Sequence, residues 1–257
     1  MNPSSARAKS GFTLTELMIV IAVIAIVASI ALPKLLGAKL TANESAAIST
    51  MRALASAQAQ LTSTGAIDSD ADGAGEYAFL GELSGLSPAR VSVAGAPALG
   101  APGVDELDPS IVSVSFGNIQ TDGIGDGVVT RSGYVFKMFL PGTSALGITP
   151  AVTEAPTGGA VAGSLPDPNN SELLWSCYAW PAATDRSGNR TFFISQEGEL
   201  LAYDNRDGQY SGLVTPASIP SFDAALSNIT GGADMAAPIA TGGAGVTNDG
   251  NTWVPVQ

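Results

Sequence analysis

A long uncharged run near the N-terminus constrains the fold of this chain more than any other feature. Residues 17–32 carry no charged side chain, and Ser29 is their only polar residue. One acidic residue, Glu16, directly precedes the run. A charge near the centre of a bilayer costs about 2.5–3.5 kcal/mol on insertion scales. A carboxylate in this position therefore indicates a function and requires a partner.

The same region predicts one long helix from Phe12 to about Leu61, closed by a glycine cap at Gly65. Only Pro33 and one interior glycine, Gly37, interrupt the helical pattern. About fifty residues at 1.5 Å each extend about 75 Å, whereas the hydrocarbon core of a bilayer is about 30 Å thick. We therefore expect the first half to span a membrane and the second half to project beyond it. Pro33 lacks a main-chain donor, so we expect a kink or local melting there.

Beyond Pro33 the helical pattern becomes amphipathic. Apolar side chains recur at three-, four- and seven-residue spacings, at Leu36, Leu40, Ala47, Met51, Leu54 and Leu61. The polar residues Lys39, Asn43 and Arg52 mostly fall between them. A stripe of this kind predicts that the second half of the helix packs against a sheet.

The residues that open the helix resemble a processing signal. Residues 9–17 form the sequence Lys-Ser-Gly-Phe-Thr-Leu-Thr-Glu-Leu. This sequence resembles the signature of type IV prepilins and of pseudopilins from type II secretion systems, in which a prepilin peptidase cuts after the glycine and methylates the new N-terminal residue. The resemblance implies cleavage between Gly11 and Phe12, N-methylation of Phe12, and assembly roles for Glu16 and Pro33. The new amine would lie four residues before Glu16 and is its nearest candidate partner.

An ordinary secretory signal is the alternative interpretation of this stretch. Arg7 and Lys9 precede an apolar run, and residues 29–31 offer a cleavage site with small residues. Two features argue against it: Glu16 interrupts the front of the run, and the helical pattern continues beyond residue 31. The two leader cations, without a leader acid, place the N-terminus in the cytoplasm.

Composition excludes several classes of function. The chain has 11 basic and 23 acidic side chains, and loss of Arg7 and Lys9 would change the formal charge from −12 to −14 (9 − 23). So acidic a surface disfavours nucleic acid as a partner. The chain contains no histidine, which removes the commonest general base and the Ser–His and Cys–His pairs. We therefore expect no catalytic residues and no enzyme activity. Cys177 is the only cysteine, so no intrachain disulfide can form.

The remainder of the chain predicts an antiparallel sheet with long loops. Strands are predicted at residues 90–93, 111–116, 134–140, 173–180, 190–195 and 199–203, with a possible edge strand at 253–256. A Gly/Pro/Ala-rich loop is expected at 94–103 and an exposed loop at 141–170. Tyr134, Phe136, Met138 and Leu140 should share one face of their strand. Cys177 and the aromatic residues of the strands, Trp175, Tyr178, Trp180, Phe192 and Phe193, are predicted to be core.

One acidic loop resembles a calcium site in part. Its carboxylates alternate, at Asp68, Asp70 and Asp72. Calcium takes six to eight oxygen ligands, gathered by a tight bend such as one at Gly73. A helix–loop–helix site would need a glutamate where Phe79 stands, and Glu76 or Glu82 could replace it only with a different geometry. Calcium is therefore the one cofactor considered, with a plain Asp/Gly turn as the alternative. Two further acidic clusters, at residues 122–127 and 204–208, are predicted to be turns.

These patterns together predict an α+β, pilin-like fold: a long N-terminal helix packed on an antiparallel sheet. The expected parts, in chain order, are a cleaved leader at 1–11, a membrane-spanning and filament-core half-helix at 12–33, an amphipathic half-helix at 34–64, a β-rich globular domain at 65–210 and a glycine-rich segment at 211–257. For the last segment, both docking and partial disorder are compatible with the sequence.

The predicted function is that of a structural subunit of a type IV pilus-like filament. Its expected partners are copies of itself or other pilin subunits, the prepilin peptidase, the inner-membrane assembly machinery and the membrane, with no nucleic acid. The subunit would lie in the inner membrane as a single-pass protein before it enters an extracellular pilus or a periplasmic pseudopilus. Three alternatives stay open: a type II secretion pseudopilin, a membrane-tethered module that binds calcium or another ligand, and an exported enzyme behind an ordinary signal.

Overall fold

The first helix, α1 (Leu14–Thr64), is the longest element of the protein. The computed structural model describes residues 11–227, 233–240 and 247–256, and it divides the chain into two units, Met1–Lys39 and Leu40–Gln257. The helix continues through Pro33, so the local melting expected there is not observed. Gly65 ends the helix in the left-handed conformation, with φ +61°, and its N–H donates to the Thr62 carbonyl at 3.2 Å. This is the glycine cap that the sequence predicts.

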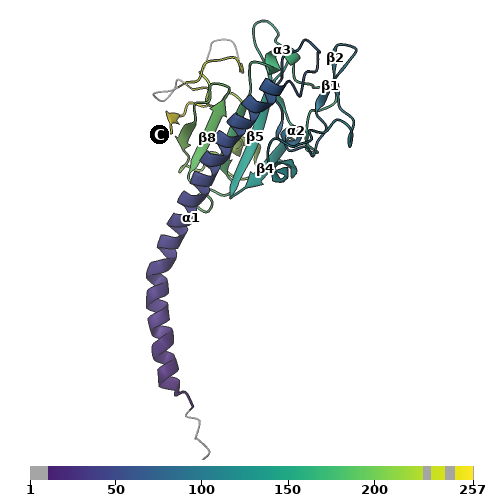
Figure 1. The fold of residues 1–257 in the computed structure, drawn as a ribbon. Coiled ribbons are helices and arrows are strands. Elements are labelled where there is room, and N and C mark those ends of the chain that lie inside the picture. The colour runs from purple at the N-terminus through teal and green to yellow at the C-terminus, as the bar shows by residue number, and fades with distance from the viewer. Residues whose placement is uncertain (1–10, 228–232, 241–246, 257) are drawn as a thin grey trace, which may run out of the picture. The chain divides into compact units, whose positions relative to one another are not determined.

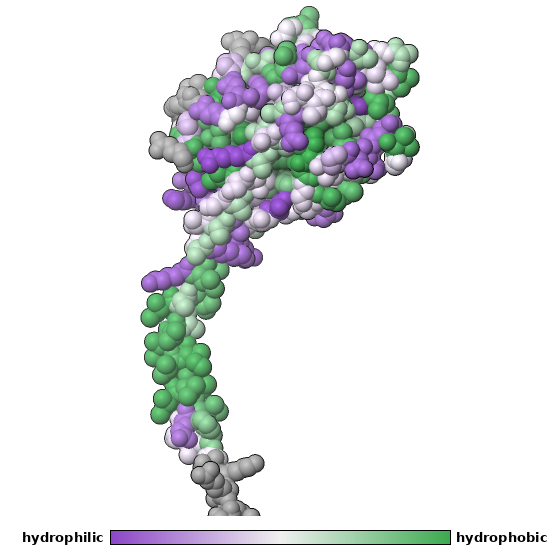
Figure 2. All heavy atoms as spheres, in the orientation of Figure 1, coloured by the Kyte–Doolittle hydropathy of each residue, from purple (hydrophilic) through white to green (hydrophobic). Residues whose placement is uncertain are grey.

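In the first unit, none of the described residues is buried. The large apolar side chains from Phe12 to Leu36 are all about half exposed or more, and green apolar atoms cover this part of α1 in Figure 2. Among the described residues, α1 is the one helix that is long and apolar enough to cross a membrane. A surface of this kind is stable only in lipid or against other apolar surfaces.

In the second unit, one face of α1 packs against a sheet, as Figure 1 shows for the stretch that crosses β5 and β8. The buried residues of the helix are Ala47, Met51, Leu54, Ala57, Gln58 and Leu61. The predicted stripe is thus confirmed from Ala47 onwards. It is wrong at Leu36, which is 62% exposed, because that residue belongs to the first unit.

The sheet is antiparallel throughout, with strand order β10-β9-β8-β7-β5-β4-β3 and β6 paired to β5. The strands are β3 (Gln120–Thr121), β4 (Gly127–Arg131), β5 (Tyr134–Pro141), β6 (Ala151–Thr153), β7 (Ser176–Pro181), β8 (Arg190–Ser195), β9 (Leu201–Asp204) and β10 (Val254–Pro255). A separate hairpin pairs β1 (Arg90–Val93) with β2 (Ala96–Leu99). The predicted α+β fold is confirmed: a long apolar helix packs on an antiparallel sheet, as in pilins.

Both faces of the sheet are buried. Alternate side chains of β5, including Phe136 and Met138, join α1 in one core, as the alternation predicts. The opposite face forms a second core with Val135 and Phe139. Tyr210 and the described part of the C-terminal segment cover that second face; the buried residues of the segment are Ile219, Ala224, Ala225, Leu226, Met235, Ala237 and Trp253. The glycine-rich stretches at 231–232 and 241–245 lie outside the described residues.

Three predictions for the connecting segments are wrong. Residues 111–116 form no strand but bends and a short 3₁₀ helix, η1 (Val114–Gly117). The expected loop at 94–103 contains β2, because the left-handed Ala94 and Gly95 turn the chain back into a hairpin. The expected exposed loop at 141–170 contains β6 and the start of a short helix, α3 (Pro168–Ser171), and it buries Glu154 completely. Residues 80–83 form another short helix, α2 (Leu80–Leu83).

Candidate assembly site and acidic loop

Glu16 lies in the first turn of α1 and closes a capping box with Thr13. The Thr13 N–H and hydroxyl each donate to Glu16 Oε2 at 2.8 Å. In return, the Glu16 N–H donates to Thr13 Oγ1 at 3.2 Å. These reciprocal bonds satisfy main-chain donors that a helix N-terminus leaves unpaired. The sequence motif assigns no role to Thr13, although a threonine three residues before a glutamate is itself the signature of this box.

The capping box changes the interpretation of Glu16. The sequence suggests that the Glu16 carboxylate has no partner in its own chain. In the structure, Glu16 Oε2 already accepts two hydrogen bonds from Thr13. Both residues are exposed, so an incoming cation could reach them. Glu16 therefore has one structural role in the isolated helix, and any pairing with another subunit has to add to it or replace it.

The residues at the expected cleavage point are open to solvent. Phe12 is 84% exposed. A Cβ built on Gly11 would meet no heavy atom of the described residues within 4 Å. The described part of the fold therefore gives no steric reason for glycine at position 11.

Comparison with known families places this geometry in context. Residues 6–32 match the family model described as the prokaryotic N-terminal methylation motif. This motif is the prepilin-type cleavage and methylation signal typical of type IV pilins and pseudopilins. The search of curated proteins and the search of solved structures each returned no significant match. The chain thus combines a prepilin-type N-terminal motif with a pilin-like α+β fold. Pilins are generally structural proteins rather than enzymes.

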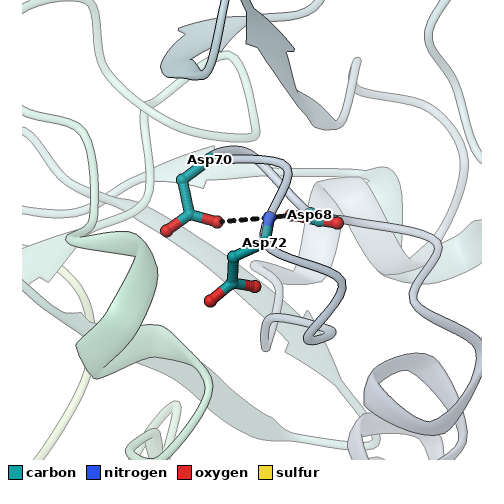
Figure 3. Close-up of side chains that lie close together, drawn as sticks. All are labelled: Asp68, Asp70 and Asp72. Atoms are coloured by element: carbon teal, nitrogen blue, oxygen red, sulfur yellow. Dashed lines mark hydrogen bonds between the residues drawn. The ribbon is translucent and has the colours of Figure 1, made fainter.

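The acidic loop brings its three aspartates together. One carboxylate oxygen from each of Asp68, Asp70 and Asp72 lies within 4.8 Å of the others (Figure 3). The loop's own N–H groups hold these carboxylates: the Asp72 N–H donates to Asp68 Oδ1 at 3.2 Å, and the Gly73 N–H donates to Asp68 Oδ2 at 3.0 Å. The main chain thus orients the carboxylates without help from a metal, as an Asx turn also does.

The two glutamates considered as further calcium ligands point elsewhere. Glu76 and Glu82 are fully buried and form ion pairs with Arg90, at 2.6 Å and 3.2 Å. Another acidic residue, Glu172 next to α3, lies close enough to the loop to feel the charges of its aspartates. Burial and the charges of Asp72 and Asp70 raise the pKa of Glu172. Its Oε1 is buried without a hydrogen-bond partner among the described residues. The sequence gives no signal for Glu172, because it lies about a hundred residues from the loop and meets it only in the fold.

The other two acidic clusters are turns, as predicted. In the first, Asp122 N–H donates to the Asp126 carbonyl at 2.9 Å, and both side chains form ion pairs with Lys137. In the second, an exposed Arg206 lies 3.5 Å from Asp204. Neither cluster gathers three carboxylates in the described part of the chain.

Cys177 and its aromatic neighbours are core residues, which confirms the prediction. Cys177 is fully buried in β7, and burial raises the pKa of its thiol. A thiol that stays protonated is a poor nucleophile. Trp175, Tyr178 and Trp180 are likewise buried. Their role is to pack the two faces of the sheet.

Proposed function

We propose that this protein is a structural subunit of a type IV pilus-like filament. A prepilin peptidase would cut between Gly11 and Phe12 and methylate Phe12, and the subunits would polymerise through α1. The observation that carries the proposal is the methylation motif at the head of a helix whose apolar side chains are exposed from Phe12 to Leu36. Before assembly this segment would anchor the subunit in the inner membrane, and in the filament it would form the core.

Glu16 would set the axial register of the filament. In the packed core, the Phe12 amine of an incoming subunit would approach Glu16 of a subunit already in place. An unpaired charge is heavily penalised in so apolar a medium, so the subunits would settle where amine and carboxylate meet. The amine would compete with Thr13 for Oε2 or bind Oε1, and the first residues of the helix would adjust accordingly.

The mass of the mature N-terminal peptide tests the processing step. We expect the peptide to begin with N-methyl-Phe12, and the full chain to appear in filaments sheared from the cell surface. An N-terminus at Leu32 would instead indicate an ordinary signal and would overturn the proposal. Correct processing with the protein confined to the periplasm would favour the pseudopilin of a type II secretion system.

A calcium-binding role of the acidic loop is the second candidate. We infer that Asp68, Asp70 and Asp72 can bind calcium, because their carboxylates converge and the buried, unpaired Glu172 Oε1 lies in the field of their charges. Calcium prefers such oxygen ligands and tolerates irregular geometry. Binding would neutralise part of the repulsion within this cluster. Calorimetric titration with calcium tests this role separately from filament assembly.

A further inference from the structure

A buried lysine in the central strand has no role in the proposed filament function. Lys137 lies in β5, and its side chain is 1% exposed. Its Nζ lies 2.7 Å from Asp122 Oδ2 and 2.7 Å from Asp126 Oδ2. The Nζ also lies 5.4 Å from the centre of the Phe139 ring, within the second core. The Lys137 Nζ is thus held against two carboxyl groups and largely shielded from water.

The two carboxyl groups have different surroundings. The Asp122 side chain is fully buried, and its Oδ1 accepts hydrogen bonds from the N–H groups of Ile124 at 3.0 Å and Asp126 at 2.9 Å. The Asp126 side chain is 22% exposed, and its Oδ1 accepts a hydrogen bond from the Thr153 hydroxyl at 2.8 Å. Asp122 therefore has main-chain donors on the oxygen that would carry negative charge if its carbon were attacked. Asp126 is positioned to accept and return protons.

We propose that Lys137 and Asp122 condense into an intramolecular amide cross-link, with Asp126 as the proton carrier. The geometry supplies the parts that acyl transfer needs: a nucleophile, a base in contact with it and donors for the oxyanion. Burial excludes competing water and holds the reacting groups together, which raises their effective concentration. The cross-link would join the β3–β4 turn to β5 in a chain whose single cysteine allows no intrachain disulfide.

The condensation balances without an external reactant. Transfer of one proton from Lys137 Nζ to Asp122 Oδ2 first gives a neutral amine and a neutral acid. The amine lone pair attacks Asp122 Cγ, Asp126 takes a proton from the nitrogen, and the negative charge develops on Oδ1. The C–Oδ2 bond then breaks as Asp126 returns the proton, which releases one water molecule and leaves an amide. A pocket of about 300 Å³, lined in part by Asp126, Lys137 and Thr153, gives this water a route out.

Mass spectrometry of the full chain tests the cross-link directly. We expect the detergent-extracted, denatured wild-type protein to be lighter by one water than its processed sequence requires. After tryptic digestion, residues 91–131 should stay joined to residues 132–186, with no cleavage at Lys137. Release of a free 132–137 peptide, or the full calculated mass, would overturn the proposal. Because this measurement uses the wild-type protein, it does not depend on the folding of any variant.

Matched variants separate the cross-link from other losses of water. A succinimide at an Asp-Gly pair, such as Asp126-Gly127, would give the same mass change but would leave Lys137 open to trypsin. Lys137→Arg keeps the charge but cannot form this amide, and Asp126→Asn removes the proton carrier, so both should show their full calculated mass. Lys39→Arg, the same change at an exposed lysine, should still lose one water. If Lys137→Arg also loses the water, the amide is excluded.

Discussion

The two units of the chain differ in whether their apolar side chains are exposed or buried. In the first unit, α1 leaves Leu17, Ile19, Ile26 and other large apolar residues exposed all around the helix. In the second unit, the same helix buries one face against a sheet whose other face is covered as well. The second unit therefore buries its apolar surface within the chain. The first unit can bury its apolar surface only in a membrane or among neighbouring helices. This is what the proposed function requires, because the subunit would be held in lipid and then polymerise.

Polar groups follow the same division. The buried cations of the second unit, Arg90 and Lys137, are each paired with two carboxylates. In the first unit, the partner that the described residues give Glu16 is its own helix terminus. The difference indicates where substitutions should act. Changes in the first unit should alter processing and assembly without unfolding the sheet, whereas changes in the second should alter stability.

The largest effect is expected from substitutions of Glu16. Glu16→Ala should insert and be processed, but it should fail to enter filaments because the incoming amine finds no carboxylate. Glu16→Gln is the sharper variant, since glutamine can still close the capping box but carries no charge. Quantification of subunit in sheared filaments against subunit in membranes measures both. Normal assembly of Glu16→Gln would mean that Glu16 acts as a cap and not as a charge.

Substitution of Gly11 should also abolish filaments, because it should block the cleavage that precedes assembly. Gly11→Val should block cleavage, so that intact mass shows a retained leader and filaments are absent. The structure leaves open space around Gly11, so the substitution should not disturb the helix itself. Ala38→Val, at an exposed position in the same unit, serves as a matched control that should be processed normally. Cleavage of Gly11→Val at the wild-type rate would contradict the assigned processing site.

In the second unit, the largest loss of stability is expected at Arg90. Its guanidinium donates to Glu76, Glu82 and the Tyr77 carbonyl, all within the core. Arg90→Ala would leave two buried carboxylates without their cation, and removal of one partner from a buried ion pair costs about 3–5 kcal/mol. Denaturant unfolding of the detergent-extracted chain measures this.

The exposed pair between Arg206 and Asp204 provides the control for Arg90. The Arg206 side chain is 76% exposed and lies 3.5 Å from Asp204. Arg206→Ala should therefore change the free energy of unfolding by less than about 1 kcal/mol. Equal effects of the two substitutions would show that the Arg90 network contributes no more than a surface pair.

The sequence predicted the features that depend on local periodicity. The length of α1, its glycine cap at Gly65 and the alternation along β5 all follow from spacing and turn chemistry. The C-terminal side of the second core could not be predicted, because the segment that covers the sheet there is rich in glycine, alanine and threonine and has no clear period. Considered alone, a lysine at position 137 predicts that this face of β5 is exposed. It is buried because Asp122 and Asp126 meet it from another segment, and such a contact is fixed only by the fold.

The site was predictable to a similar extent. Gly11, Phe12 and Glu16 are recognised from a contiguous motif, and their roles remain proposals. Thr13 could have been found from its spacing to Glu16. By contrast, Glu172 reaches the acidic loop through tertiary structure alone, and the burial of Glu76 against Arg90 depends on a strand that begins beyond the loop.

A smaller, pH-dependent effect is expected at Glu154. Burial raises the pKa of this carboxyl to about 8, from an ordinary value of 4.5. Its Oε1 accepts hydrogen bonds from the N–H groups of Gly81 and Gly159, at 2.6 Å and 3.1 Å. The folded state holds a proton that the unfolded state has lost, so Glu154 should lower stability progressively as the pH rises from about 4.5 to about 8. Glu154→Gln should flatten the pH dependence over this range in unfolding curves. An unchanged pH profile in that variant would contradict the assignment.

The smallest expected effect is the response of the acidic loop to calcium. If Asp68, Asp70 and Asp72 bind the ion only in the folded state, a calcium concentration about ten times the Kd stabilises that state by about 1.4 kcal/mol. Asp70→Asn should reduce both the heat of titration and the rise in melting temperature. Asp204→Asn, in the cluster that already contains Arg206, should leave both unchanged. If the wild-type protein shows no calcium-dependent heat and no melting shift, the loop is an Asx turn and not a calcium site. The N–H groups of the loop already donate hydrogen bonds to its carboxylates.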